Sequence, residues 1–269
     1  MNLALSREHW GKAKEDFTSA LRSWNLWSLL AINDIKQRYK RSRLGQFWIT
    51  LSTAIFIGGI GTIFALLFKM DIGNYLPYFA VNVIFWTLIS GVINDSSSVY
   101  PNAALYLKQE ATPKFVFLFR LLTHHLIIFA HNAAIIVAVF VVFLKPPTSA
   151  LFLFIPGLVL VQITLLLISM IIGVLAARYR DLTQIISSVL QILYFATPIM
   201  WRPEQIGESG KMIVDLNPFA SLLFLVSQPL LGIVPSAATY AKSIVFIIIL
   251  AAVALPLFAK FRARIVYWL

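Results

Sequence analysis

The sequence predicts an all-α integral membrane protein with six membrane-spanning helices. Composition, apolar segments and charge distribution support this prediction. Of the 269 residues, 59% are hydrophobic and 12% are charged, and the mean hydropathy is +0.83. A soluble chain of this length cannot bury so much apolar surface. Six segments approach or exceed the roughly 20 residues that a spanning helix needs, and inside lipid they must be helical to satisfy their backbone hydrogen bonds. They are Trp48–Phe68, Tyr78–Val99, Phe115–Leu144, Ala150–Ala177, Leu182–Trp201 and Ser243–Ala259.

Positive charge is distributed unequally among the segments that connect these spans. Alternate connections, together with both termini, contain 17 of the 22 Lys and Arg residues. Basic residues accumulate on the cytoplasmic side of membrane proteins, so we expect both termini in the cytoplasm. The basic residues behind the net charge of +11 then set the topology and contact anionic lipid. They do not indicate nucleic-acid binding.

The segment before the first span predicts a helix at the membrane surface. Residues 1–23 are polar, whereas Trp24–Phe47 contains an apolar stripe at helical spacing, followed by basic residues. The stripe consists of Trp24, Trp27, Leu30, Ala31 and Ile35. We expect an amphipathic helix lying in the interface; a solvated linker is the alternative. Residues 1–47 thus form an expected cytoplasmic segment, and residues 48–264 a six-span domain.

The connection Tyr100–Lys114 predicts a short helix on the cytoplasmic side. Pro101 and Pro113 frame about nine residues, Asn102–Glu110, because proline is tolerated at the start of a helix and terminates it further on. The helix is too short to span the membrane. It is either a connector or a docking element for a soluble partner.

The long external connection, Arg202–Lys242, is expected to contain a re-entrant segment. It is apolar from Phe219 to Val234, but a seventh span there would reverse the charge rule at the C-terminus. Pro218, Pro229, Gly232 and Pro235 also break the run. We therefore expect two short helices that enter the outer leaflet and return, which is tolerated where protein or a water-filled cavity covers them.

The residues give no sign of catalysis, of a metal site or of ATP binding. Gly207–Met212 has two residues between its glycines where a phosphate-binding loop has four, and Met follows the Lys. His124 and His131 are about 10 Å apart along a helix, too far to share a metal ion. We expect Asp95 to belong to a polar cluster at a helix end, not to a proton relay.

Aromatic side chains suggest how a substrate is held. The chain contains 21 Phe, 9 Tyr and 7 Trp residues, and many of them are expected in the core or in interfacial belts. Trp86 lies in the middle of the second span, and Tyr194, Phe195 and Trp201 lie near the outer end of the fifth. Aromatic faces stack on sugar rings without a fixed hydrogen-bond pattern, so these residues are candidate walls of a tunnel.

Four stretches, in order along the chain, resemble the ABC-2 family of polysaccharide export permeases. The first is Asp34–Trp48, before the first span. The second extends from Phe85 through Asn94, Ser98, Asn102 and Lys108 to Pro113; the third runs from Arg178 to Pro198, and the fourth is Asp215–Phe219. The resemblance covers residues 24–264. One departure is that Leu225–Gln228 is uncharged, where the family often has Arg or Lys.

The resemblance implies a homodimer of six-span permeases in a bacterial inner membrane, driven by two copies of a separate ATPase. ATP and magnesium would be bound by that partner, and this chain would have no cofactor. The substrate would be a lipid-linked polysaccharide, of which we expect O-antigen over capsule or teichoic acid. The expected ATPase-docking residues are Asn102, Leu105, Tyr106, Lys108, Glu110, Arg38 and Arg41. The expected channel residues are Trp86, Tyr194, Phe195 and Trp201, and the expected external gate is Asn217, Pro218 and Phe219.

Two other functions remain open from the sequence. One is an ABC-2 permease for a small hydrophobic molecule or drug. The other is a membrane-embedded glycosyltransferase, which needs acidic residues at a loop for general-base or metal-nucleotide chemistry. Glu204, Glu208 and Asp215 lie together on the external side, although their spacing does not indicate a catalytic set.

Overall fold

The computed structural model describes residues 7–40, 42–109 and 112–269. The chain is 84% helical and has no strands among the described residues, as the sequence predicts. The α-helices are α1 (Arg7–Arg22), α2 (Trp24–Tyr39), α3 (Phe47–Leu67), α4 (Ile72–Ser96), α5 (Ala104–Gln109), α6 (Phe115–Val142), α7 (Phe154–Arg178), α8 (Leu182–Ala196), α9 (Pro203–Ile206), α10 (Glu208–Leu216), α11 (Pro218–Leu230), α12 (Ala237–Phe261) and α13 (Ile265–Trp268). The 3₁₀ turns are Pro101–Ala103, Ser149–Leu153 and Arg262–Arg264.

Within the described residues, five helices are long and apolar enough to cross a membrane: α3, α4, α6, α7 and α12. They correspond to five of the six predicted spans. The sixth, Leu182–Trp201, differs from the prediction because α8 ends at Ala196 after 15 residues. At 1.5 Å per residue α8 is about 22 Å long, shorter than the hydrocarbon layer. The chain turns away from the helix axis before Pro198, which cannot donate a helical hydrogen bond.

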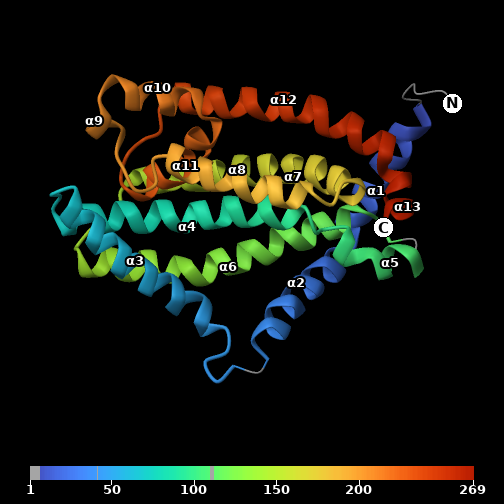
Figure 1. Cartoon of the computed structure of the whole chain (residues 1–269), viewed down its shortest axis with the longest axis horizontal. Helices are drawn as coiled ribbons and strands as arrows, with labels where there is room; N and C mark the ends of the chain where they lie inside the picture. The colour runs from blue at the N-terminus through green and yellow to red at the C-terminus, as the bar shows by residue number, and fades with distance from the viewer. Residues whose placement is uncertain (1–6, 41, 110–111) are drawn as a thin grey trace.

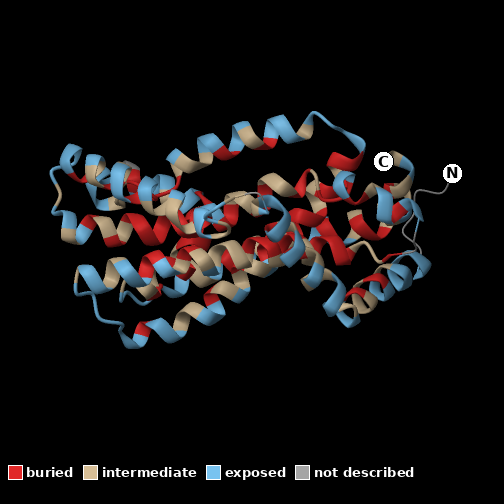
Figure 2. Cartoon of the chain, turned by 90° about the horizontal axis from the view of Figure 1, so that it is seen from below, coloured by how far each residue is buried: buried red, intermediate tan, exposed pale blue. Residues whose placement is uncertain are grey.

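Helix α4 forms the centre of the bundle. It packs against α3, α6, α7, α8 and α11, and most of its side chains between Phe79 and Ile93 are buried. Figure 2 shows this buried middle, with the more exposed helices around it. In lipid the outer apolar faces of α3, α6 and α12 need no protein cover, so their exposure agrees with a membrane-embedded chain.

The two ends of the bundle are built from different parts of the chain (Figure 1). Helices α1, α5 and α13 lie at one end of the bundle, which we call the terminal end. The α3–α4 turn, α9 and α10 lie at the other, which we call the distal end. The arrangement places α1, α13 and the connection that contains α5 together; that this end faces the cytoplasm stays a prediction.

The N-terminal segment forms two helices, and α2 rests against α6. The predicted apolar stripe divides between two environments: Ala31 and Ile35 are buried, whereas Trp24 is exposed. The Trp27 ring packs on Phe119, with ring centroids 5.8 Å apart. The helix ends at Tyr39, so the predicted single helix to Phe47 is interrupted by turns around Gly45, whose φ is +53°. The position of α2 in the membrane interface stays a prediction.

The described part of the predicted cytoplasmic helix Asn102–Glu110 is helical from its start. A 3₁₀ turn at Pro101–Ala103 leads into α5, Ala104–Gln109, and Glu110 lies outside the described residues. Leu107 is buried and attaches the helix to the bundle.

The predicted re-entrant segment contains a sharp bend. The axes of α10 and α11 meet at 96°, with Asn217 between them. The α11 backbone lies close to α7, because a Cβ atom at Gly157 would lie 2.2 Å from the Leu225 carbonyl oxygen. The second half of the segment is therefore buried inside the bundle. Whether it enters and leaves by the same face of the membrane stays a prediction.

Candidate functional site

An aromatic cluster joins α4, α8 and α11 near the middle of α4. The Trp86 ring packs edge-on against Tyr194, with centroids 6.1 Å apart, and against Phe219, with centroids 6.5 Å apart. Tyr194 also meets Phe195 edge-on at 5.3 Å. Edge-to-face geometry at these distances is the favoured arrangement for aromatic pairs. The structure thus brings together two predicted channel residues, Trp86 and Tyr194, and links them to Phe219 of the predicted gate.

The cluster forms part of the wall of a groove of about 330 Å³ between α3, α4 and α8. The lining residues are Ser52, Thr53, Phe56, Val83, Trp86, Thr87 and Tyr194. The lining contains no charged side chain. Ser52, Thr53 and Thr87 donate their hydroxyl protons to carbonyls of their own helices, so their oxygens remain free to accept. The Tyr194 hydroxyl is buried and has no partner.

These three hydroxyl residues were missing from the predicted site. Ser52 and Thr53 are adjacent in α3, and Thr87 follows Trp86 in α4. Hydroxyl residues in spanning helices bond to their own backbone so readily that their sequence gives no strong signal. Their position opposite Trp86 and Tyr194 becomes visible once α3 is packed on α4.

Two predicted channel residues lie outside the groove lining. Phe195 points away, with 69% of its surface exposed. Trp201 makes no ring contact with the cluster; its indole N–H donates to the Phe195 carbonyl at 2.9 Å and holds the turn after α8. Trp86 and Tyr194 line the groove, whereas Phe195 and Trp201 do not; that the four residues form one channel wall stays a prediction.

The predicted gate residues connect α8 directly to α11. The Asn217 side chain accepts from the Phe219 amide at 2.9 Å and thereby caps α11. Its amide nitrogen donates to the Ala196 carbonyl at 3.2 Å and to the Thr197 hydroxyl at 3.0 Å. Pro218 occupies the first helical position, where its missing N–H costs nothing. The buried Asn217 side chain thus connects the end of α8 to the bend before α11.

The predicted docking residues lie at the terminal end. Leu105 is 65% exposed and Tyr106 is 43% exposed, while Asn102 and Lys108 are also exposed. Adjacent exposed apolar side chains on a short helix outside the spans are typical of a protein contact. Arg41 and Glu110 were predicted to dock as well, but they lie outside the described residues.

Arg38 and Asn102 share a second cavity, of about 280 Å³, although they come from different predicted docking elements. Its other lining residues are Asp34, Asp95, Ser98, Val99, Phe117, Arg120, Leu121 and His124. Arg120 forms a two-pronged ion pair with Asp34, with nitrogen–oxygen distances of 2.7 and 2.5 Å. This pair fixes α2 to α6, because a planar guanidinium matches a carboxylate in two bonds.

Asp16 forms a further connection at this end. Its buried carboxylate accepts from Arg262 Nε at 2.5 Å and from the Phe115 amide at 3.0 Å. Burial lowers the pKa of nearby Lys114, and the Asp16 carboxylate acts in the opposite direction. Neither ion pair was predicted, since the partners are 86 and 246 residues apart.

The described residues contain no group of three His, Cys, Asp or Glu side chains placed to hold a metal ion. Asp95 bonds to His125 Nε2 at 3.0 Å, and the rings of His124 and His125 meet edge-on. The polar residues of α4 and α6 thus bond to one another near the terminal end, as expected for Asp95.

Comparison with known proteins identifies the family. Residues 25–231 match the ABC-2 type transporter family, which is more than half of the chain. An O-antigen export system permease protein RfbA of Klebsiella pneumoniae is 28% identical over 207 residues, which are 74% of this chain and 78% of that protein. The RfbA permease of Myxococcus xanthus is 24% identical over 197 residues, covering 72% and 75% of the two chains. The matched residues include α2, all of the groove and the bend at Asn217, and the chain belongs to the ABC-2 type transporter family.

Proposed function

We propose that this chain is the permease subunit of an ABC exporter that moves a lipid-linked polysaccharide, of the O-antigen class, across a bacterial inner membrane. Family membership makes it a membrane subunit of a transporter, not an enzyme, and implies an ABC ATPase as partner. The names of the relatives support the substrate class. The structural observation that carries the proposal is the uncharged groove of aromatic rings and hydroxyls beside Trp86.

The groove suits a sugar chain that must keep moving. Ring faces offer contact to sugar rings, and free hydroxyl oxygens offer weak hydrogen bonds. A fixed charge would hold one segment of the polymer, whereas conduction needs binding that is weak and repeated. A drug-sized hydrophobic molecule would need no hydroxyl lining, so the groove favours the polysaccharide.

A second copy of the chain would close the groove. A hydrated sugar cannot face lipid, and the helices on either side of the groove expose apolar residues such as Phe56, Ile63, Ile192 and Phe195. We propose that these flanks of α3 and α8 meet a second protomer, so that two grooves enclose one tunnel. The terminal end would face the cytoplasm, where two ATPase subunits would contact α5 and the α2 region.

The glycosyltransferase alternative loses support in the structure. Glu208 pairs with Lys211 at 2.8 Å and Asp215 pairs with Lys242 at 2.6 Å. These exposed acids are bonded to surface lysines and do not converge with Glu204 on a common site.

Alanine substitution tests the proposed groove. Trp86→Ala and Tyr194→Ala, in the groove wall, should each slow export of a lipid-linked polysaccharide in cells that depend on this permease, and so should Phe195→Ala, on the flank proposed to meet the second protomer. The amount of protein in the membrane and its association with the ATPase should be unchanged. The matched control is Phe152→Ala, at an aromatic residue 83% exposed and away from the groove. Wild-type export by all three variants would contradict the aromatic wall, and loss of assembly would show that the rings serve packing.

A further inference from the structure

A third cavity lies at the distal end, and its lining contains charged side chains, unlike that of the aromatic groove. It measures about 530 Å³ and lies between the start of α4, the α6–α7 connection, the residues around α9, and α11. Lys145 and Arg202 belong to its lining, together with one acidic residue, Glu204. The aromatic groove has none of these residues in its wall. The two cavities are therefore separate sites with different chemistry.

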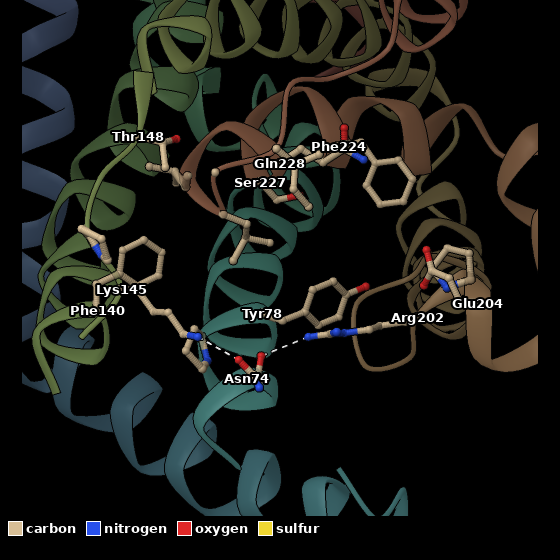
Figure 3. A pocket seen from close by; sticks show the side chains of 17 residues that line it. Asn74, Tyr78, Phe140, Lys145, Thr148, Arg202, Glu204, Phe224, Ser227 and Gln228 are labelled. Carbon is tan, nitrogen blue, oxygen red and sulfur yellow. Dashed lines mark hydrogen bonds between the residues drawn. The ribbon is translucent and has the colours of Figure 1, made fainter. Parts of the chain in front are cut away.

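Lys145 and Arg202 converge on one neutral residue. Lys145 Nζ donates to Asn74 Oδ1 at 2.8 Å, and an Arg202 Nη donates to the Asn74 carbonyl at 3.0 Å. Figure 3 shows the two cations reaching Asn74 from opposite sides of the cavity. Neither cation forms an ion pair with a described carboxylate, Glu204 included. Two like charges directed at the same place repel each other, and an anion between them would remove that repulsion.

Arg202 also retains unused donor capacity. Its guanidinium lies over the Tyr78 ring at 4.8 Å from the centroid, which fixes its plane. Its Nε atom is buried and has no hydrogen-bond partner. A buried charged donor without an acceptor is unfavourable in folded proteins, so this atom at the cavity wall is suited to donate to a bound anion.

The rest of the lining defines the kind of anion. Ser227 and Gln228 add neutral polar groups from α11, while Phe140, Phe224, Leu231 and Ile233 add an apolar wall. An arginine fork with a second cation suits the several oxygens of a phosphate. The apolar wall suits a hydrocarbon attached to it.

We propose that this cavity binds a phosphate group carried on a lipid, with Arg202 and Lys145 as its ligands. This proposal goes beyond the proposed export function, because it does not depend on which glycan the permease moves. The phosphate belongs either to a membrane phospholipid or to an isoprenoid pyrophosphate carrier; free inorganic phosphate would use the polar half of the cavity alone.

Titration calorimetry on the full-length chain in a nonionic detergent tests this assignment. The probes are dihexanoylphosphatidylglycerol, farnesyl pyrophosphate, inorganic phosphate and octanoate. The wild type should bind at least one phosphate probe, and bind it at least tenfold more tightly than octanoate. Tightest binding of farnesyl pyrophosphate indicates an isoprenoid carrier, and equal binding of both amphiphiles, each tighter than inorganic phosphate, indicates any lipid phosphate. Equal binding of all three phosphates would overturn the lipid part of the proposal.

Variants locate the site. The double variant Lys145→Gln/Arg202→Gln should weaken phosphate binding at least tenfold. The control Lys211→Gln, at an exposed lysine of the same end outside the cavity, should stay within twofold of wild type. If the double variant does not fold, the single variant Lys145→Gln tests the site. Lys145 is exposed and its side chain bonds to Asn74, so its substitution should leave the fold intact. Lys145→Gln should weaken phosphate binding at least threefold. Absence of phosphate binding, equal binding of octanoate, or wild-type affinity in these variants would overturn the proposal.

Discussion

At the terminal end, charged side chains join segments that are far apart in the sequence, whereas at the distal end most connections are neutral. Asp16 and Asp34 attach α1 and α2 to Arg262 and Arg120 through partly or fully buried ion pairs. At the distal end Tyr75 and Tyr78 donate to the carbonyls of Met200 and Pro198, each at 2.7 Å.

The two kinds of connection differ in how strongly they resist separation. Removing one partner of a buried ion pair leaves an uncompensated charge, so such a pair resists separation strongly. A neutral hydrogen bond to a carbonyl contributes about 1 kcal/mol net, less than is lost when a buried ion pair is broken. The connections of the terminal end are therefore the stronger ones, which agrees with the proposed ATPase docking at that end and the proposed substrate passage at the other.

The largest expected effect concerns the docking surface at the terminal end. Replacing Leu105 and Tyr106 with Asp should abolish co-purification of the ATPase, because two exposed apolar contacts would become charged. The control Leu144→Asp changes a residue that is 86% exposed beyond the end of α6 and should leave co-purification intact. Normal co-purification of the ATPase with the Leu105/Tyr106 variant would show that α5 is not part of the docking surface.

The next effect concerns the buried carboxylate of α1. Asp16→Asn keeps the side chain's shape but leaves Arg262 without its charged partner. We expect the free energy of unfolding in detergent, measured by SDS titration, to fall by about 3 kcal/mol. Asp181→Asn, at an exposed aspartate in the α7–α8 connection, should change it by less than about 0.5 kcal/mol. Equal values for the two variants would show that the buried ion pair does not stabilise the terminal end.

A smaller effect is expected at the bend of the distal end. Asn217→Ala removes the α11 cap and both bonds to the end of α8, which should lower the free energy of unfolding by about 1.5 kcal/mol. Asn217→Asp should restore the cap but not the two donated bonds, and so recover part of the loss. A loss as large as that of Asp16→Asn would mean that the distal end is held as rigidly as the terminal end.

The sequence predicted the elements that depend on local pattern. Apolar length identified α3, α4, α6, α7 and α12, and the two prolines around α5 indicated a short helix there. Pro218 after Asn217 indicated the start of α11. Each of these features is determined by nearby residues, through lipid solvation or proline geometry.

The features that were missed depend on contacts between distant residues. The pairs Asp16–Arg262 and Asp34–Arg120 come from helices whose approach no local pattern reveals. The early end of α8 at Ala196 reflects the turn held by Asn217 and Trp201. Likewise, no local pattern reveals that Lys145 and Arg202 converge on Asn74, because this requires the packed α4, α6 and α9 region.

The central claim is that the terminal and distal ends face opposite sides of the membrane. The chain has no cysteine, so single cysteines can be placed at two exposed positions, Lys211 at the distal end and Ala263 at the terminal end. In sealed spheroplasts, a membrane-impermeant maleimide should label position 211. It should label position 263 only after the membrane has been permeabilised. Labelling of position 263 in sealed spheroplasts, or protection of position 211, would contradict the account.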